Sequence, residues 1–186
     1  MRVIAGEFRS RPLVAPEGNQ TRPTPDRLRE SLFSALGDRV EGCVFFDGYA
    51  GSGSVGIEAL SRGAKRAIFV EKHPQALVAL RANLDKLRLS DRALVISGSV
   101  AKMGAKMGAK MGAKVLPQQV ADIVFLDPPY DRETEYPLAM EAVGDCKLLL
   151  VQHSVRLVLP EACRGLSRFR QMKQGDNMIS FYEKTK

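Results

Sequence analysis

A glycine-rich turn between a short apolar run and a helical pattern constrains this fold more than any other stretch. The apolar run ends at Asp47, and residues 51–56 read Gly-Ser-Gly-Ser-Val-Gly, which is the spacing G-x-G-x-x-G. Glycines at these positions allow a tight turn, close backbone approach to a ligand, and close packing of a helix on a strand. About twenty residues further on, a second apolar run ends at Glu71, where a carboxylate can hold a ribose hydroxyl. The stretch predicts a nucleoside-cofactor site; the alternative is a plain tight turn between a strand and a helix.

Strand and helix patterns alternate from residue 43 onward. Alternation of this kind predicts an α/β fold with a mostly parallel sheet and helices on both faces, the doubly wound arrangement. The tail departs from this rhythm, because residues 166–172 and 178–182 alternate with period two around Gly175 and predict a terminal antiparallel hairpin. The other predicted strands lie near 43–47, 67–71, 93–97, 121–126 and 147–152, and the predicted helices near 54–62, 74–88, 100–114 and 134–145.

Length and composition restrict the class of protein. The 186 residues suit one domain with a real core, and no apolar run approaches the roughly 20 residues that span a bilayer. The first residues also lack the apolar region of a signal peptide, so we expect a cytoplasmic protein without a membrane segment, and a monomer by default. The three widely spaced cysteines predict buried, reduced thiols, and two distant histidines do not suggest a metal site.

Residues 1–24 predict a small basic hairpin ahead of the main domain, which we place at residues 25–186. Thr24 then suits a helix N-cap and Pro25 the first helical position, with Gly37 ending the helix. One reading of the N-terminal arginines is a solvated face; the functional reading is a basic lip over the glycine turn that grips phosphates. These arginines are Arg2, Arg9, Arg11 and Arg22.

Residues 101–114 form a repeat, Ala-Lys-Met-Gly three times and then Ala-Lys. Its four lysines account for much of the net charge of +7, so charge alone supports a nucleic-acid partner only modestly. Three glycines make a long isolated helix marginal. We expect an inserted surface helix or loop, with an RNA-contact stripe as the alternative.

The chemical motif follows the apolar run at 121–126, which leads into Asp127-Pro128-Pro129-Tyr130. Two consecutive prolines fix φ and remove donors, so the backbone leaves the sheet as a rigid bend. A carboxylate, a carbonyl and an aromatic ring are then held together at the carboxyl edge of a strand. Such a group can accept both hydrogens of a planar exocyclic amine while the ring stacks on the base. The lone pair of such an amine is delocalised, so the amine is a poor nucleophile. The motif would therefore act chiefly by orienting the amine nitrogen toward an electrophilic methyl group.

Taken together, these motifs resemble the RsmD-type family of small-subunit ribosomal RNA guanine-N2 methyltransferases, within the Rossmann-like class that uses S-adenosylmethionine. The resemblance covers nearly the whole chain, and the N-terminal arginine block separates this family from other Asp-Pro-Pro-Tyr enzymes. It implies a seven-stranded sheet with an antiparallel C-terminal strand, and methylation of guanine N2 in small-subunit rRNA, on an assembled particle. The segments that carry it include residues 1–6, 22–30, 47–53, 58–64, 70–71, 83–84, 127–130 and 175–176.

The resemblance also assigns roles to residues. Asp127 would bind the guanine amine, Pro128 would offer its carbonyl, and Tyr130 would stack on the base. Arg22 and Thr24 would line the substrate side, with the basic hairpin toward the RNA. The cofactor would be held at its methionine end by Asp47, Ala50, Gly51 and Gly53, at its ribose by Glu71, and at its adenine by Ser99 and Val100.

Two positions depart from the family pattern. Ser99 stands where the family usually has an aspartate, so the adenine contact lacks a charge, and Gln152 stands where an acid is usual. Three other readings stay open: methylation of adenine in DNA or RNA, methylation of a protein glutamine, and a non-catalytic RNA-binding relative. A nicotinamide dehydrogenase would share the glycine turn but would not account for Asp127 and the two prolines that follow it.

Overall fold

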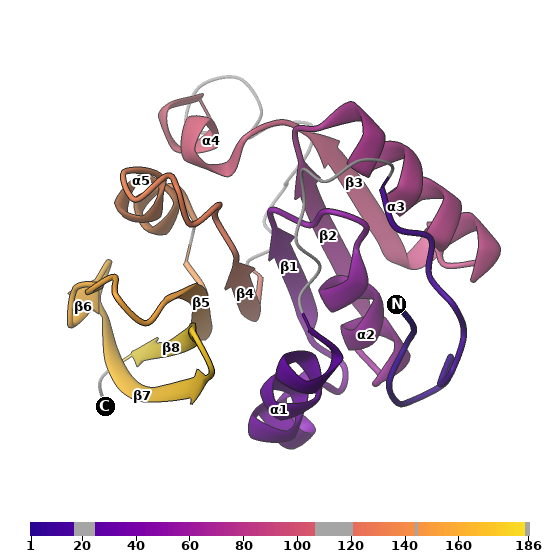
Figure 1. Cartoon of the computed structure of the whole chain (residues 1–186), viewed down its shortest axis with the longest axis horizontal. Coiled ribbons are helices and arrows are strands. Elements are labelled where there is room, and N and C mark those ends of the chain that lie inside the picture. Colours follow the sequence, from indigo (N-terminus) through magenta and orange to yellow (C-terminus); the bar gives the residue numbers. More distant parts are fainter. Residues whose placement is uncertain (17–24, 107–120, 144, 185–186) are drawn as a thin grey trace. The chain divides into compact units, whose positions relative to one another are not determined.

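A computed structural model describes residues 1–16, 25–106, 121–143 and 145–184 of the chain (Figure 1). These residues form two compact units, Met1–Ser97 and Gly98–Lys186, called unit 1 and unit 2 below. Each unit has its own strands and its own buried side chains, so each is described by itself.

Unit 1 is built on three parallel strands in the order β3-β2-β1. Parallel neighbours need a crossover between them, and α2 and α3 supply it (Figure 1). Side chains of β1 and β2 such as Phe45 and Phe69 are fully buried, as expected for strands covered on both faces. The elements are α1 (Asp26–Leu36), β1 (Val44–Gly48), α2 (Ser54–Ser61), β2 (Arg66–Glu71), α3 (Pro74–Lys86) and β3 (Ala93–Ser97), with short 3-10 helices at Gly37–Val40 and Ser90–Arg92.

Unit 2 combines one parallel pair with an antiparallel C-terminal part. Strand β4 pairs in parallel with β5, whereas β8 is antiparallel to both β5 and β7, and β6 is antiparallel to the start of β7. The last two long strands meet in a tight turn at Gly175, whose φ is +60°. The elements are α4 (Val100–Lys106), β4 (Ile123–Leu126), α5 (Glu135–Ala142), β5 (Leu148–Ser154), β6 (Ala162–Cys163), β7 (Leu166–Gln174) and β8 (Asn177–Lys184).

The predicted α/β class, with parallel strands and an antiparallel C-terminal hairpin, is confirmed. Each predicted strand forms within a few residues of its expected bounds. Strand β6 is additional, and its two residues pair only with Leu166 and Ser167. Helix α4 covers the first part of the predicted 100–114 helix, and the repeat from residue 107 onward lies outside the described residues.

The predicted start of α1 is wrong by one position. Pro25 is the N-cap rather than the first helical residue, because its ψ of 141° is extended and its carbonyl accepts hydrogen bonds from the amides of Leu28 and Arg29. Thr24, expected as the cap, lies outside the described residues. Gly37 ends the helix as predicted, with a φ of +53°.

The N-terminal residues form a small hairpin held on α2. The amide of Val3 donates to the carbonyl of Arg11 at 3.0 Å, and the amide of Leu13 donates to the carbonyl of Met1 at 3.0 Å. The buried carboxylate of Glu58 on α2 accepts the amides of Ile4 and Ala5 at 2.8 and 3.0 Å. The basic hairpin expected from the sequence is therefore anchored to unit 1 by a buried acid.

The three cysteines are buried and unpaired, as expected for reduced thiols. Within the described ranges, no helix has the length and apolar character needed to cross a bilayer.

Candidate functional site

The glycine turn after β1 has three residues in the left-handed region. Gly51 and Gly53 have φ of +55° and +83°, and Tyr49 has φ of +69°. The amides of Tyr49 and Ala50 both donate to the carbonyl of Val70 at 3.0 Å, which ties the turn to the end of β2. A tyrosine with positive φ is uncommon, and strained residues of this kind concentrate at functional sites.

Of the three glycines, Gly56 has the packing role that its spacing predicts, whereas Gly51 and Gly53 differ from the predicted order. A Cβ on Gly56 would lie 2.3 Å from the Phe69 ring, so only glycine lets α2 pack this closely on β2. A Cβ on Gly53 would lie 2.3 Å from Leu80 of α3. Among the residues that the structure describes, no atom lies within 4 Å of a Cβ placed on Gly51, so the described part of the chain leaves space for a ligand there.

Asp47 ends β1 with a buried carboxylate, 1% exposed. Its Oδ2 accepts the amide of Gly56 at 2.8 Å, which fixes the first turn of α2. Burial raises the pKa of Asp47 to about 7; the Gly56 hydrogen bond opposes this and the charge of Glu71 adds to it. A carboxyl group with a pKa near neutrality gains its charge easily when a cation binds beside it.

Glu71 ends β2 and holds the other side of the same turn. Its Oε2 accepts the amide of Gly51 at 2.8 Å, and its Oε1 accepts the amides of Lys72 and His73 at 2.7 and 2.8 Å. Each carboxylate oxygen has two acceptor positions, so Glu71 keeps capacity for a hydroxyl donor. The structure thus brings together the predicted cofactor residues of unit 1, namely Asp47, Ala50, Gly51, Gly53 and Glu71.

Asn83 is a residue that sequence reasoning did not assign to the site. It is fully buried on α3, and its Oδ1 accepts the amide of Val14 at 2.7 Å. Its Nδ2 donates to the carbonyls of Val14 and Ser52, each at 3.0 Å. Asn83 therefore joins the N-terminal segment to the glycine turn, across 69 and 31 positions of the sequence.

The N-terminal arginines belong to the hairpin that is bonded to α2, and the segment that carries Arg9 is bonded to Ser61, at the end of α2 away from the glycine turn. Arg2, Arg9 and Arg11 are exposed, whereas Arg22 and Thr24 fall outside the described residues. Arg29, which the sequence did not single out, is fully buried and donates from Nη2 to the carbonyl of Arg2 at 2.7 Å. Burial lowers the pKa of Arg29, and its ion pair with Asp26 at 2.8 Å opposes that shift. The buried guanidinium fixes the backbone that carries the exposed arginines.

The predicted adenine contacts begin unit 2. Val100 is the first residue of α4 and is buried, and Ser99 precedes it with a half-exposed side chain. The carbonyl of Ser99 accepts the amide of Lys102 at 3.1 Å. Ser99 therefore directly precedes α4, and its contact with the adenine stays a prediction.

The Asp127 motif directly follows β4, as its sequence predicts. Asp127 is half-buried and Pro128 is buried. The carbonyl of Pro128 accepts the hydroxyl of Tyr136 from α5 at 3.0 Å, a contact that the sequence did not reveal. A carbonyl has two lone pairs, so Pro128 can accept one further donor.

Tyr130 is held by side chains of two other strands in unit 2. Its hydroxyl donates to Oδ1 of Asn177 on β8 at 2.7 Å and accepts from Nε2 of Gln152 on β5 at 3.3 Å. Gln152 is 4% exposed. The two contacts fix the position of the ring through its hydroxyl.

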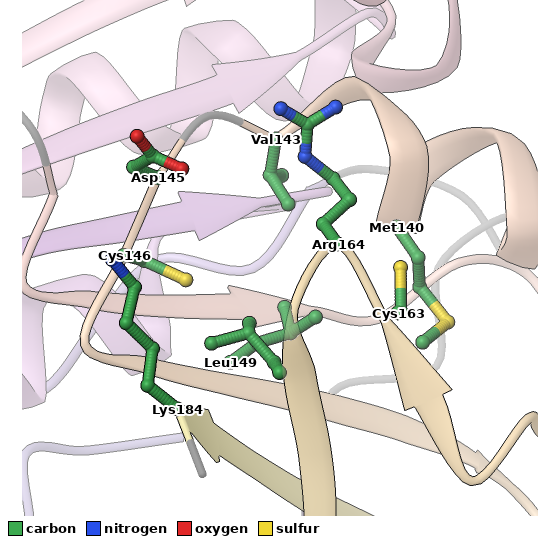
Figure 2. Close-up of a pocket in the computed structure, with 9 residues that line it drawn as sticks. Met140, Val143, Asp145, Cys146, Leu149, Cys163, Arg164 and Lys184 are labelled. Carbon is green, nitrogen blue, oxygen red and sulfur yellow. The ribbon is translucent and has the colours of Figure 1, made fainter. Parts of the chain in front are cut away.

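A pocket elsewhere in unit 2 contains none of the predicted site residues (Figure 2). It holds two of the buried cysteines, and burial raises the pKa of Cys146 and of Cys163 to about 11, so both thiols are protonated near neutrality. The pocket has a cavity volume of about 10 Å³, which is roughly enough to hold one water molecule. It is too small for a nucleobase. Its lining is Met140, Val143, Asp145, Cys146, Leu149, Cys163, Arg164, Leu166 and Lys184.

Comparison with known proteins gives a consistent set of relatives. Residues 1–183 match the family model described as conserved hypothetical protein 95. The chain is 31% identical over 189 residues to ribosomal RNA small subunit methyltransferase D of Escherichia coli K12, covering 99% of this chain and 90% of that protein. A Thermus thermophilus protein of solved structure is 30% identical, with a TM-score of 0.74 over 98% of this chain and 99% of that one. An RNA methyltransferase from Salinibacter ruber, solved with S-adenosyl-L-homocysteine, shares the fold at 14% identity, with a TM-score of 0.62 over 89% of this chain and 95% of that one.

Proposed function

The chain belongs to the RsmD-type family of ribosomal RNA methyltransferases, described as conserved hypothetical protein 95, and on that premise we propose that it methylates the exocyclic N2 of a guanine in small-subunit rRNA. The observation that carries the proposal is the fixed Asp127-Pro128-Pro129-Tyr130 motif, in which Tyr130 is held by Asn177 and Gln152. The relative from Escherichia coli is named for the same substrate class. A cytoplasmic monomer acting on ribosomal particles is part of the proposal.

The residues of the glycine turn fit S-adenosylmethionine. The open space at Gly51 admits a ligand against the backbone, and Glu71 keeps acceptor capacity for ribose hydroxyls. The buried carboxyl of Asp47, with its raised pKa, suits a ligand that carries a positive charge. Ser99 and Val100 would border the adenine. When bound, the cofactor supplies an electrophilic methyl group.

The motif residues would hold and orient the guanine. The Asp127 carboxylate and the remaining lone pair of the Pro128 carbonyl accept the two N2 hydrogens, while Tyr130 stacks on the base. Fixing both N–H bonds directs the nitrogen and offsets its weak nucleophilicity. The Asp127 carboxylate also offers a site for the proton that the nitrogen releases.

The exposed arginines of the N-terminal hairpin would bind RNA phosphates. Arg2, Arg9 and Arg11 are exposed on a backbone that Glu58 and Arg29 hold in place. Arg22 and Thr24 complete the proposed substrate side. Phosphate contacts of this kind position the RNA without reading its sequence.

The first experiment is methyl transfer from labelled S-adenosylmethionine to small ribosomal subunits that lack the modification, followed by nucleoside analysis. We expect label in N2-methylguanosine. Label in adenine, or in protein, would replace the guanine assignment while keeping the methyltransferase. Absence of both label and cofactor binding would favour the non-catalytic RNA-binding reading.

The Asp127→Ala variant tests the catalytic assignment. We expect turnover to fall by about 100-fold or more, the range for removing one preorganised hydrogen-bonding group, while calorimetry finds cofactor affinity unchanged. Asp131→Ala is the matched control, because Asp131 is an exposed carboxylate four residues along the chain. Turnover of Asp127→Ala close to that of the control would refute the role of Asp127.

A further inference from the structure

Strand β7 contains a bulge that brings an aromatic ring to the surface of unit 2. Its register against β8 moves from Arg168 opposite Tyr182 to Arg170 opposite Phe181, so Phe169 is the extra residue. Phe169 is 47% exposed, although phenylalanine is more often buried. Bulges are frequent next to functional sites, where they re-aim a side chain.

Phe169 and Arg170 lie together on the buried ring of Phe181. The Phe169 ring meets it edge-on, with centroids 6.1 Å apart, and the Arg170 guanidinium lies 5.5 Å from its centroid. Arg170 is exposed and makes no ion pair with any residue that the structure describes. The pair therefore offers an aromatic surface and, within the described ranges, a positive charge that no ion pair compensates.

The Tyr130 hydroxyl is bonded to the same face of the sheet. Alternate residues of a strand point to one face, so Asn177, Ile179 and Phe181 of β8 share a face, and Asn177 accepts the Tyr130 hydroxyl. Four residues separate Asn177 from Phe181, which is about 13 Å along a strand. The acid on this face, Glu183, lies two residues further from Tyr130. Between Phe181 and Asn177, the residues of β7 and β8 on this face are neutral apart from Arg170.

We propose that Phe169 and Arg170 bind the single-stranded RNA that flanks the target guanine, Phe169 by stacking on a base and Arg170 by contacting a phosphate. The proposal rests on the proposed function, because it takes Tyr130 as the contact of the target base. Aromatic rings beside arginines are the usual means of binding unpaired RNA, and such stacking tolerates any base. Phe169 and Arg170 would thus increase the affinity of the protein for RNA and orient the bound strand, without selecting its sequence.

The test measures binding of the full chain to a fluorescein-labelled single-stranded oligoribonucleotide by anisotropy at several salt concentrations. Phe169→Ala should weaken binding by about 5- to 150-fold, the range for losing one base stack, and Phe169→Tyr should keep near-normal affinity. Arg170→Gln should reduce the salt slope of log affinity by about 0.7, the value for one phosphate contact on a single strand. Lys173→Gln is the matched control, since Lys173 lies on the same strand but pairs with Met178 on the opposite face.

Three results would overturn the inference. They are unchanged binding by Phe169→Ala, an equal loss from Lys173→Gln, and a change of oligomeric state in Phe169→Ala without loss of RNA affinity, which would make the surface a protein contact. Thermal melting of each variant distinguishes misfolding from the loss of an RNA contact. If alanine at position 169 unfolds the bulge, Phe169→Tyr still tests the aromatic ring in a folded protein.

The inference and the proposed function can fail separately. If the unaltered chain does not methylate rRNA but binds RNA through Phe169, only the proposed reaction is wrong. If it produces N2-methylguanosine and both variants bind RNA normally, only the inference is wrong.

Discussion

The buried carboxyl of Asp47 makes the stability of the protein depend on pH in a defined direction. Its pKa is raised from 3.8 to about 7, chiefly by burial, so the folded state holds a proton that the unfolded state releases. The stabilising contribution is complete below pH 4, and it is lost as the pH rises toward and through 7. Asp47→Asn keeps an acceptor for the Gly56 amide at 2.8 Å and cannot ionise, so it isolates the effect.

The size of the effect follows from the two pKa values. Relative to the protonated form, ionisable Asp47 costs about 4 kcal/mol of folding free energy at pH 8 and about 2 kcal/mol at pH 5. The wild-type chain should therefore lose roughly 2–3 kcal/mol relative to Asp47→Asn between these two pH values. For a chain of this length that difference corresponds to about 5–10 °C in melting temperature.

The assay is thermal melting of the two proteins in matched buffers at pH 5, 6, 7 and 8. Other titrating groups are common to both proteins, so only the difference between the two melting temperatures is interpreted. We expect that difference to change in favour of Asp47→Asn as the pH rises. Parallel profiles would show that Asp47 is ionised throughout and would refute the reasoning from burial.

The same titration gives a test for the cofactor. If S-adenosylmethionine binds beside the ionised form, its apparent affinity falls with the ionised fraction, by about tenfold at one pH unit below the pKa. The α-amino group of the ligand stays protonated in this range. Affinity should therefore decrease between pH 7 and pH 6 for the wild-type chain and stay constant for Asp47→Asn. If the cofactor affinity of the wild-type chain does not change with pH, Asp47 only holds the glycine turn and does not interact with the cofactor's charge.

Two further predictions concern the same turn. Gly56→Ala should destabilise the protein by about 1–3 kcal/mol, because its Cβ would overlap the Phe69 ring. Gly51→Ala has open space and should destabilise it by only about 1 kcal/mol, because of the positive φ at this position. Urea unfolding measures both free energies, and equal losses of stability would contradict the packing argument. Asn83→Leu should release the N-terminal segment, because it removes three hydrogen bonds and leaves buried polar groups at a cost of about 1–3 kcal/mol. Faster trypsin cleavage after Arg9 would show that release, and an unchanged cleavage rate would argue against this anchor.

Local patterns in the sequence predicted much of the fold. Period-two and helical periodicities placed the strands and helices, because buried strands and amphipathic helices need those spacings. The glycine spacing correctly predicted the close helix–strand packing at Gly56, whereas the open position is Gly51 and not Gly53, which lies against Leu80. The strand β6 was missed because two residues carry no periodic signal.

The anchors of the site could not be predicted in the same way. Glu58 binds amides 53 and 54 residues earlier, and Asn83 binds Val14 across 69 residues. A single polar residue in a helix has no periodicity that reveals its partner, and only the folded chain brings the two together. Arg29 is the clearest case, because a buried arginine reads in the sequence as one more exposed charge.

Gln152, where the resemblance implies an acid, has a hydrogen-bonding role that only the structure reveals. The Tyr130 hydroxyl gives its one proton to Asn177 Oδ1, so its oxygen can only accept from another neighbour. The amide of Gln152 supplies that donor from Nε2, whereas an ionised acid at the same position would have no proton to give. An acid here would need either a proton of its own or the Tyr130 hydroxyl turned away from Asn177. Glutamine therefore fixes one orientation of the Tyr130 ring at any pH, and the loss of a negative charge beside a proposed RNA site costs nothing in binding a polyanion.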